Sequence, residues 1–354
     1  MQKFFSPSPF VQANGYNEDD PLLQKRKDGI VMMRRFVSLL MVCVVVLFAS
    51  GAALAAYPEK AITIVCPWGA GGGTDRVIRA MGAELEKALG QPVVIENKTG
   101  GDGAVGHSFG ARAKPDGYTL TCTTFELATL HWMGVKSAPT HQDYEHIAMI
   151  NSDPAAMAVK ADAAWKDLAA LLDDIRANPG KRLFSGTAKA GIWDLARLAL
   201  MNAAGLKAED ALWIPSKGAA SAIPEILGGH IDVITCGIAE LKTQLENGEL
   251  RALVLMSPER SKTFPDVPTA RELGYDVAYA TVRGLSAPKG TPKEIVAVLN
   301  DAVKKACESP TFVEFMEKNS FAITYQDSAA YAETLAKADA DSKASMELGG
   351  YLRQ

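Results

Sequence analysis

Short apolar runs alternate with amphipathic segments from Tyr57 to the C-terminus, and this alternation constrains the fold more than any other feature of the chain. The run from Ile62 to Cys66 is rich in β-branched residues and gives way to glycines. Apolar residues then recur at helical spacing from Val77 to Leu85. A strand, a turn and a helix in succession, repeated along the chain, predict an α/β protein with parallel sheets, and the length suffices for two domains.

The same patterns predict individual elements. The predicted strands lie at 62–66, 93–96, 119–123, 147–150, 156–159, 183–185, 212–214, 233–236, 252–255 and 284–287. The predicted helices lie at 74–89, 104–113, 165–177, 193–204, 219–227, 238–247, 292–307, 310–318 and 328–346. One helix start is unusually clear, with Thr291 as the expected N-cap, Pro292 at the first helical position and Glu294 completing a capping box.

The N-terminal segment carries an export signal. A basic pair after Met32 is followed by an apolar core from Phe36 to Phe48 and by the A-x-A sequence of Ala53 to Ala55. This order predicts a secretory signal peptide over 32–56 and a periplasmic mature protein. The apolar core is shorter than the roughly 20 residues that a spanning helix needs. Residues 1–31 precede the signal, and a start codon assigned too early would explain them.

Charge and cysteine content exclude some functions. The chain has 37 Lys and Arg against 41 Asp and Glu, a formal net charge of −4, and it has no basic run. Nucleic-acid binding is therefore not expected. Four cysteines follow the signal, each alone within an apolar run, and this placement favours buried free thiols over disulfides. They are Cys66, Cys122, Cys236 and Cys307.

Candidate motifs for catalysis and for metal or cofactor binding are either absent or stand in a context that does not fit them. Gly101 to Gly106 matches G-x-G-x-x-G, with Glu126 further along the chain, but the glycines follow the second predicted strand instead of the first. A Gly-rich βα turn is the better interpretation. His141 and His146, with Asp143 and Glu145, have a spacing that could hold a metal, although a solvated loop is favoured. The chain has no G-x-S-x-G, H-E-x-x-H or C-x-x-C motif. No enzyme, cofactor or metal is predicted.

Two glycine-rich turns lead into helices. Trp68 to Asp75 joins the first predicted strand to its helix, and Ser185 to Ile192 does the same in the second half of the chain. The first amides of a helix lack internal partners, and the helix dipole places partial positive charge there, so such turns bind phosphate, sulfate or carboxylate. Ordinary connecting turns are the alternative. Two such turns facing one another would clamp a small anion.

Five ordered segments resemble one known family. They are "YPEKAITIVCPWGAGGGTDRVIRAMGAELEKALGQPVVIENKTGGDGAVG", "KPDGYTL", "GAASAIPEILGGHIDVI", "LRALVLMSPERSKTFPDVPTARELGY" and "LSAPKGTPKEIVAVLN". Together they resemble the extracytoplasmic solute receptors of the tripartite tricarboxylate transporter family, also called Bug proteins. The resemblance extends from Tyr57 almost to the C-terminus.

The resemblance implies a fold and a function. It implies a periplasmic binding protein of the type II-like class, with two domains, each a mostly parallel sheet flanked by helices, and a ligand in the interdomain cleft. Domain 1 would comprise 57–155 and 281–354, and domain 2 would comprise 156–280. The receptor, which is expected to be a monomer, would bind a small carboxylate through backbone amides and deliver it to a membrane transporter of the tripartite tricarboxylate type. An orphan receptor that signals to a sensor protein is the alternative.

The resemblance also implies the site residues. The expected ligand-binding residues are Trp68, Gly69, Ala70, Gly71, Gly72, Gly73, Thr74, Asp75, Thr123, Thr124, Ser185, Gly186, Thr187, Ala188, Lys189, Ala190, Gly191 and Ile192. Three charged residues depart from the family pattern and could alter the ligand class or remain solvated: Glu126, Lys189 and Arg283.

Overall fold

The computed structural model describes residues 57–353. The strands and helices of the described residues lie in one compact unit that begins at Pro58. The predicted signal peptide at 32–56 and the extension at 1–31 lie outside the described residues. Within 57–353, no helix has the length and apolar character needed to cross a membrane.

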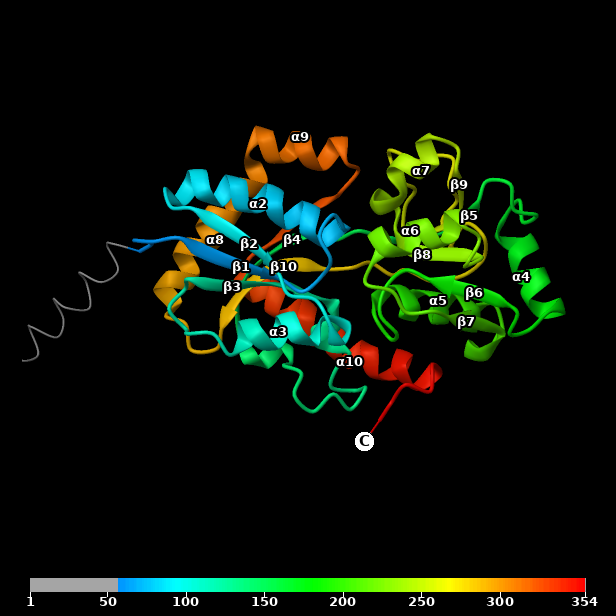
Figure 1. The fold of residues 1–354 in the computed structure, drawn as a ribbon, viewed down its shortest axis with the longest axis horizontal. Coiled ribbons are helices and arrows are strands. Elements are labelled where there is room, and N and C mark those ends of the chain that lie inside the picture. Colours follow the sequence, from blue (N-terminus) through cyan, green and yellow to red (C-terminus); the bar gives the residue numbers. More distant parts are fainter. Residues whose placement is uncertain (1–56, 354) are drawn as a thin grey trace, which may run out of the picture. The chain divides into compact units, whose positions relative to one another are not determined.

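The first sheet contains strands from both ends of the described chain. They are β1 (Ile62–Cys66), β2 (Val93–Asn97), β3 (Thr119–Thr124), β4 (Tyr144–Asn151), β10 (Arg283–Pro288) and β11 (Ile323–Gln326). Their order across the sheet is β11-β4-β10-β3-β1-β2. In Figure 1, α2 (Gly73–Leu89), α8 (Lys293–Glu308) and α9 (Pro310–Lys318) lie on one side of this sheet, and α3 (Ala104–Ala111) and α10 (Ser328–Leu348) lie on the other. This sheet and its helices form the first lobe.

The second sheet is built from the middle of the chain. Its strands are β5 (Ala155–Lys160), β6 (Arg182–Ser185), β7 (Ala211–Trp213), β8 (Val233–Gly237) and β9 (Leu250–Met256). Their order is β7-β6-β8-β5-β9. The accompanying helices are α4 (Leu168–Ala177), α5 (Ile192–Ala203), α6 (Ala219–Leu227) and α7 (Lys242–Glu246). This sheet and these helices form the second lobe.

Strand pairing in both sheets is mixed. Parallel pairs join β2-β1-β3 and β7-β6-β8, as the alternation of strands and helices predicts. By contrast, β5 and β10 run antiparallel to both of their neighbours, and β11 runs antiparallel to β4. Both β5 and β10 bring the chain into a sheet from the other lobe, so they run against the strands of the βα units. The architecture of two helix-flanked sheets is confirmed, but its sheets are mixed instead of mostly parallel.

The two crossovers between the lobes lie side by side. Pro154 and Ala280 form an antiparallel bridge. The Ala155 amide donates to the Tyr279 carbonyl at 2.8 Å, and the Thr281 amide donates to the Asp153 carbonyl at 2.9 Å. The expected domain boundaries, at 155/156 and 280/281, fall in these crossovers, and the division of the chain into those domains remains a prediction.

Most predicted elements are present with small changes at their ends. The strand β11 was not predicted, and the segment predicted as one helix at 238–247 is a short 3-10 turn, Ile238–Leu241, followed by α7. The predicted cap of α8 is wrong. The hydroxyl of Thr291 donates to the Pro288 carbonyl at 2.8 Å, and Pro292 is the N-cap without a side-chain cap.

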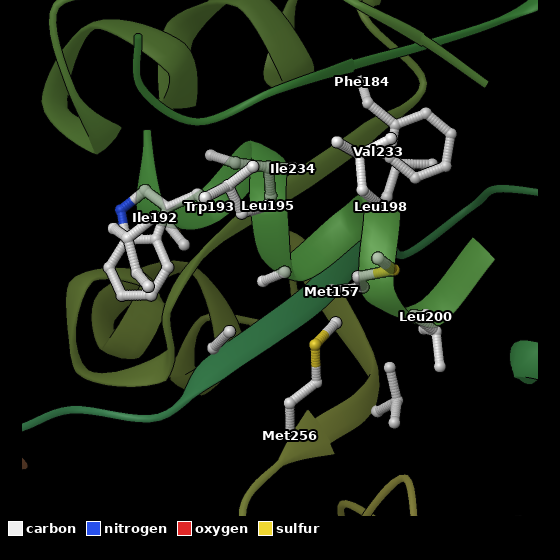
Figure 2. Close-up of a cluster of buried hydrophobic side chains, with 14 of the residues drawn as sticks. Met157, Phe184, Ile192, Trp193, Leu195, Leu198, Leu200, Val233, Ile234 and Met256 are labelled. Atoms are coloured by element: carbon white, nitrogen blue, oxygen red, sulfur yellow. The ribbon is translucent and has the colours of Figure 1, made fainter. Parts of the chain in front are cut away.

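The core of the second lobe packs α5 against its sheet. Figure 2 shows side chains of α5, among them Leu195 and Leu198, beside strand residues such as Met157, Val233 and Ile234. All of these side chains are almost completely buried. The apolar face of α5 thus holds its N-terminus at a defined position above the strand ends.

We expect Gly284→Ala to destabilise the protein and Gly82→Ala to be tolerated. A Cβ at Gly284 in β10 would lie 2.5 Å from the Ala148 carbonyl oxygen and 2.5 Å from the Tyr331 ring. Overpacking of this kind costs about 1–3 kcal/mol. A Cβ at Gly82 in α2 would meet the flexible end of Ile95 at 3.0 Å. This change also gains up to about 1 kcal/mol of helix propensity. Urea denaturation of both variants measures the difference, and equal free energies of unfolding would contradict it.

Candidate functional site

A small cavity lies where the two lobes meet. Its lining comes from turns that follow strands of both sheets, from the N-terminus of α6 and from the crossover before β10. The lining residues are Trp68, Gly69, Gly72, Gly73, Thr74, Thr124, Glu126, Thr187, Ile192, Trp193, Lys217, Gly218, Ala219, Ala220, Glu240, Thr281 and Arg283. The cavity volume is about 40 Å³, which is space for a few water molecules.

The turn before α2 is held by its own aspartate. Gly71 has a φ of +80°, a conformation that favours glycine, and its amide donates to Asp75 Oδ2 at 2.8 Å. Burial opposes the charge of Asp75, but hydrogen bonds from Arg79, Gly71 and Asn97 together hold the pKa of its carboxyl below the ordinary value. The fastened turn aims the first amides of α2 at the cavity.

The turn before α5 has the same construction. Ala190 has a φ of 56°, and its amide donates to Asp194 Oδ2 at 2.9 Å. Arg197 holds Asp194 through a bond of 2.7 Å, as Arg79 holds Asp75 in the first lobe. The two turns therefore present equivalent amides, Gly73 in the first lobe and Ile192 in the second.

Each of these amides contacts a glutamate from the opposite lobe. Glu240, in the 3-10 turn after β8, accepts a hydrogen bond from the Gly73 amide at 2.9 Å and another from the Gly237 amide at 3.2 Å. Glu126, in the 3-10 turn Phe125–Ala128 after β3, faces the Ile192 amide, which favours the charged form of its carboxyl. Two helix N-termini are thus capped across the cleft by carboxylates, an arrangement that the helix dipole favours.

A chain of hydrogen bonds orients Glu126. The Trp68 indole donates to Thr124 Oγ1 at 3.2 Å, and the Thr124 hydroxyl donates to Glu126 Oε2 at 2.6 Å. Glu126 is only 3% exposed. Burial raises the pKa of the Glu126 carboxyl, and burial likewise raises the pKa of the Glu240 carboxyl.

Arg283 is bound on several sides by the protein itself. It is 2% exposed, and it forms a salt bridge with Asp153 and a hydrogen bond with Asn151. Its Nε donates to Thr74 Oγ1 at 3.0 Å. Burial opposes the charge of this guanidinium, but Asp153 and Glu240 raise its pKa. Arg283 therefore fastens the two crossovers to the start of α2.

The structure places eight of the predicted site residues on the cavity. These are Trp68, Gly69, Gly72, Gly73, Thr74, Thr124, Thr187 and Ile192. The other predicted residues are not part of its lining: Ala70, Gly71, Asp75, Thr123, Ser185, Gly186, Ala188, Lys189, Ala190 and Gly191.

Several of the residues outside the lining have other contacts. The Thr123 hydroxyl is paired with Ser286 and with the Tyr331 hydroxyl, at 2.8 and 2.9 Å. Gly186 packs against β8, because a Cβ there would lie 1.8 Å from the Thr235 carbonyl oxygen. Lys189 is exposed, with its ammonium 4.9 Å from the centre of the Tyr351 ring.

Glu240, Trp193 and the segment 217–220 line the cavity but were not predicted. A sequence signal for Glu240 exists. Residues 121–127 read T-C-T-T-F-E-L and residues 235–241 read T-C-G-I-A-E-L, so both glutamates stand at the same place in a repeated T-C-x-x-x-E-L pattern. The repeat marks equivalent turns after β3 and β8.

The other candidate groups are structural. The four cysteines after the signal are free and buried, as predicted. His146 is buried in β4 instead of lying in a solvated loop, and burial lowers its pKa to about 4. Residues 57–353 contain no group of three or more His, Cys, Asp or Glu side chains arranged to hold a metal. Gly101–Gly103 form a 3-10 turn between β2 and α3, and Gly106 lies in the first turn of α3.

The sequence matches a family model described as "Tripartite tricarboxylate transporter family receptor" over residues 77–348. It is 30% identical to the protein BugT of Bordetella pertussis over 73% of this chain and 79% of that protein. A crystal structure of a TctC solute binding protein from Polaromonas is 34% identical, with a TM-score of 0.64, over 82% of this chain and 99% of the other. MatC from Rhodopseudomonas palustris, solved with bound malate, is 26% identical, with a TM-score of 0.73, over 82% of this chain and 99% of the other.

We expect Glu126→Gln to raise the melting temperature at neutral pH. Burial raises the pKa of Glu126 in the folded protein, so the folded state holds this proton more tightly than the unfolded state does. The wild type therefore loses stability as the pH rises above the ordinary glutamate pKa of about 4.3. The glutamine keeps an acceptor oxygen for Thr124 and Ile192 without the charge.

Melting curves of wild type and Glu126→Gln from about pH 4 to pH 7 measure this effect. The variant should melt at a higher temperature at pH 7, and the difference should disappear near pH 4. A difference that does not change with pH would contradict the assignment of burial as the dominant influence on this carboxyl.

Proposed function

The chain belongs to the tripartite tricarboxylate transporter receptor family, and we propose that it binds a small carboxylate in the cavity between its lobes. In this proposal it acts in the periplasm and delivers the solute to a membrane transporter of the tripartite tricarboxylate type. The family and the fold are those of binding receptors, which are not enzymes.

One observation carries the proposal: α2, α5 and α6 all begin at the same cavity. Converging helix N-termini stabilise a bound anion through their amides and dipoles. At α6, the amides of Ala219 and Ala220 have no hydrogen-bond acceptor within residues 57–353. The malate in MatC supports a carboxylate as the ligand class.

The crossovers support a cleft that opens and closes. The cavity of about 40 Å³ is smaller than a dicarboxylate, so the lobes must separate for one to enter. Two short neighbouring segments, 151–155 and 279–283, connect the lobes. Small φ and ψ changes in such segments are sufficient for hinge motion.

The signal peptide predicted at 32–56 supports export. We expect mass spectrometry of periplasmic protein to find a mature N-terminus at or just before Tyr57.

A thermal-shift screen tests the proposal directly. The compounds are di- and tricarboxylates, aromatic carboxylates and amino acids. A ligand that binds only the folded state stabilises it by about 2.7 kcal/mol at 100 times its Kd. We expect at least one of these compounds to raise the melting temperature in this way. Chemical alteration of the ligand in more than stoichiometric amount would contradict the receptor function.

We expect Gly73→Ala to weaken binding of the identified ligand and Lys189→Ala to leave it nearly unchanged. A Cβ at Gly73 would lie 2.6 Å from Glu240 Oε1 and 2.9 Å from Arg283 Nη2, so it would disturb the N-terminus of α2. Displacing the Glu240 carboxylate from the Gly73 amide disrupts a charge-assisted hydrogen bond on the cavity, and we expect a loss of about 1.5–3 kcal/mol in the binding free energy. Lys189 is exposed outside the cavity, and its removal should change the binding free energy by less than about 0.5 kcal/mol.

Calorimetry on both variants measures these affinities, and circular dichroism confirms that each is folded. A folded Gly73→Ala that binds normally, together with a Lys189→Ala that does not bind, would show that side-chain charge and not the glycine turn holds the ligand.

A further inference from the structure

Two glutamates occupy equivalent positions on opposite sides of the cavity. Glu126 follows β3 in the first lobe and contacts the Ile192 amide of the second. Glu240 follows β8 in the second lobe and contacts the Gly73 amide of the first at 2.9 Å. Each carboxylate therefore takes the place, at a helix N-terminus, that a carboxylate of a bound dicarboxylate would take.

The cavity holds more carboxylates than buried cations: the Arg283 guanidinium acts on Glu126 and Glu240, but it is shared with Asp153, so one buried cation serves three carboxylates. Arg283 is in a salt bridge with Asp153, and it also donates to Asn151 and Thr74. Lys217, the other cation of the lining, is exposed to solvent. A dicarboxylate would bring two more negative charges into this space, and unpaired like charges in a shielded site are costly.

The same carboxylates have unused capacity as acceptors. A carboxylate offers about four lone-pair positions. Glu240 accepts from the Gly73 and Gly237 amides, and Glu126 accepts from the Thr124 hydroxyl and faces its own amide and the Ile192 amide. The remaining positions suit a donor that is positively charged, and an ammonium group carries three N–H donors.

The N-terminus of α6 leaves space for one anion. The amides of Ala219 and Ala220 lie on the cavity without an acceptor among the described residues, and Lys217 adjoins them. The cavity thus combines an anion-binding helix N-terminus with two acidic side chains.

We infer that this receptor selects a solute carrying both a carboxylate and a protonated amine. The amine contacts Glu126 and Glu240, and the carboxylate contacts the amides at the start of α6. This inference rests on the proposed function, that a small carboxylate binds in this cleft, and it makes the two glutamates the specificity-determining residues.

Matched compounds test the inference by titration calorimetry. Succinate, β-alanine and ethylenediamine share one spacer and differ only in their charged ends. Adipate, aminovalerate and putrescine form a longer series, and terephthalate with aminomethylbenzoate forms an aromatic pair. We expect the amino carboxylate of at least one series to bind about tenfold or more tightly than its dicarboxylate, as the gain of charge-assisted bonds implies. We expect the diamine to bind more weakly than the amino carboxylate, because it cannot use the amides of α6.

The double variant Glu126→Gln/Glu240→Gln tests the role of the two residues. Glutamine keeps the size of each side chain and one acceptor oxygen for the helix amide, but it removes the charge and, at position 240, the acceptor of the Gly237 amide. We expect this variant to lose at least about tenfold in affinity for the amino carboxylate and to gain affinity for the dicarboxylate of the same series. Glu225→Gln is the matched control, because Glu225 is exposed on α6 outside the cavity, and its affinities should equal those of the wild type.

The outcomes separate the inference from the proposed function. If the dicarboxylate binds the wild type as tightly as the amino carboxylate in every series, the inference is overturned and the proposed function stands. A double variant that is folded by circular dichroism and keeps the preference of the wild type also overturns the inference. If no amino carboxylate binds, the inference fails, and the proposed function fails with it only when the thermal-shift screen also finds no carboxylate ligand.

Discussion

The contact between a helix N-terminus of one lobe and a carboxylate of the other is the interaction on which the site depends. It occurs twice, as Gly73 with Glu240 and as Ile192 with Glu126. The first amides of any helix need an acceptor, and here the acceptor comes from across the cleft. Each lobe therefore completes a helix of the other, and the geometry of the cavity follows from how closely the lobes approach. The desolvation of the two carboxylates opposes this approach, since burial raises the pKa of both.

Backbone geometry makes these contacts possible. Gly71 and Ala190 adopt left-handed conformations, and Asp75 and Asp194 bind their amides, so both turns deliver the next helix in the same way. The strain at Ala190 is notable because a non-glycine residue rarely adopts positive φ, and it is held by the bond to Asp194. Arg283 adds a link between the crossovers and the start of α2, because it joins Asp153 of one crossover to Thr74 of α2. The crossovers and the turn before α2 are therefore parts of one hydrogen-bonded network.

The sequence predicted the positions of strands and helices more accurately than it predicted side-chain contacts. Strands and helices with clear periodicity were located to within a few residues, because hydrophobic spacing reports which side of an element is buried. The strand β11 was missed, since Ile323–Gln326 is short and none of its residues is fully buried. The Thr291 cap was wrong because its hydroxyl bonds to the preceding turn instead of the helix. Glu240 was missed because its role depends on the approach of two lobes that are far apart in sequence, although the repeated T-C-x-x-x-E-L pattern marks its equivalence to Glu126. The sequence left Lys189 open between a ligand contact and a solvated position, and its ammonium lies 4.9 Å from the centre of the Tyr351 ring.

The backbone amides at a helix N-terminus favour negative charge, and they do not distinguish a carboxylate of the protein from a carboxylate of a solute. The sign of the charge that the cavity accepts is therefore determined by the side chains that reach it. Glu240 contacts the first amide of α2, and Glu126 contacts the first amide of α5. Both carboxylates line the cavity, so two positions that could bind an anion are acidic instead. The backbone of both turns needs no change for this, because the carboxylates arrive from the opposite lobe. Two carboxylates placed against these amides would, in physical terms, shift the preference of such a cavity from a doubly negative solute to one that carries both charges.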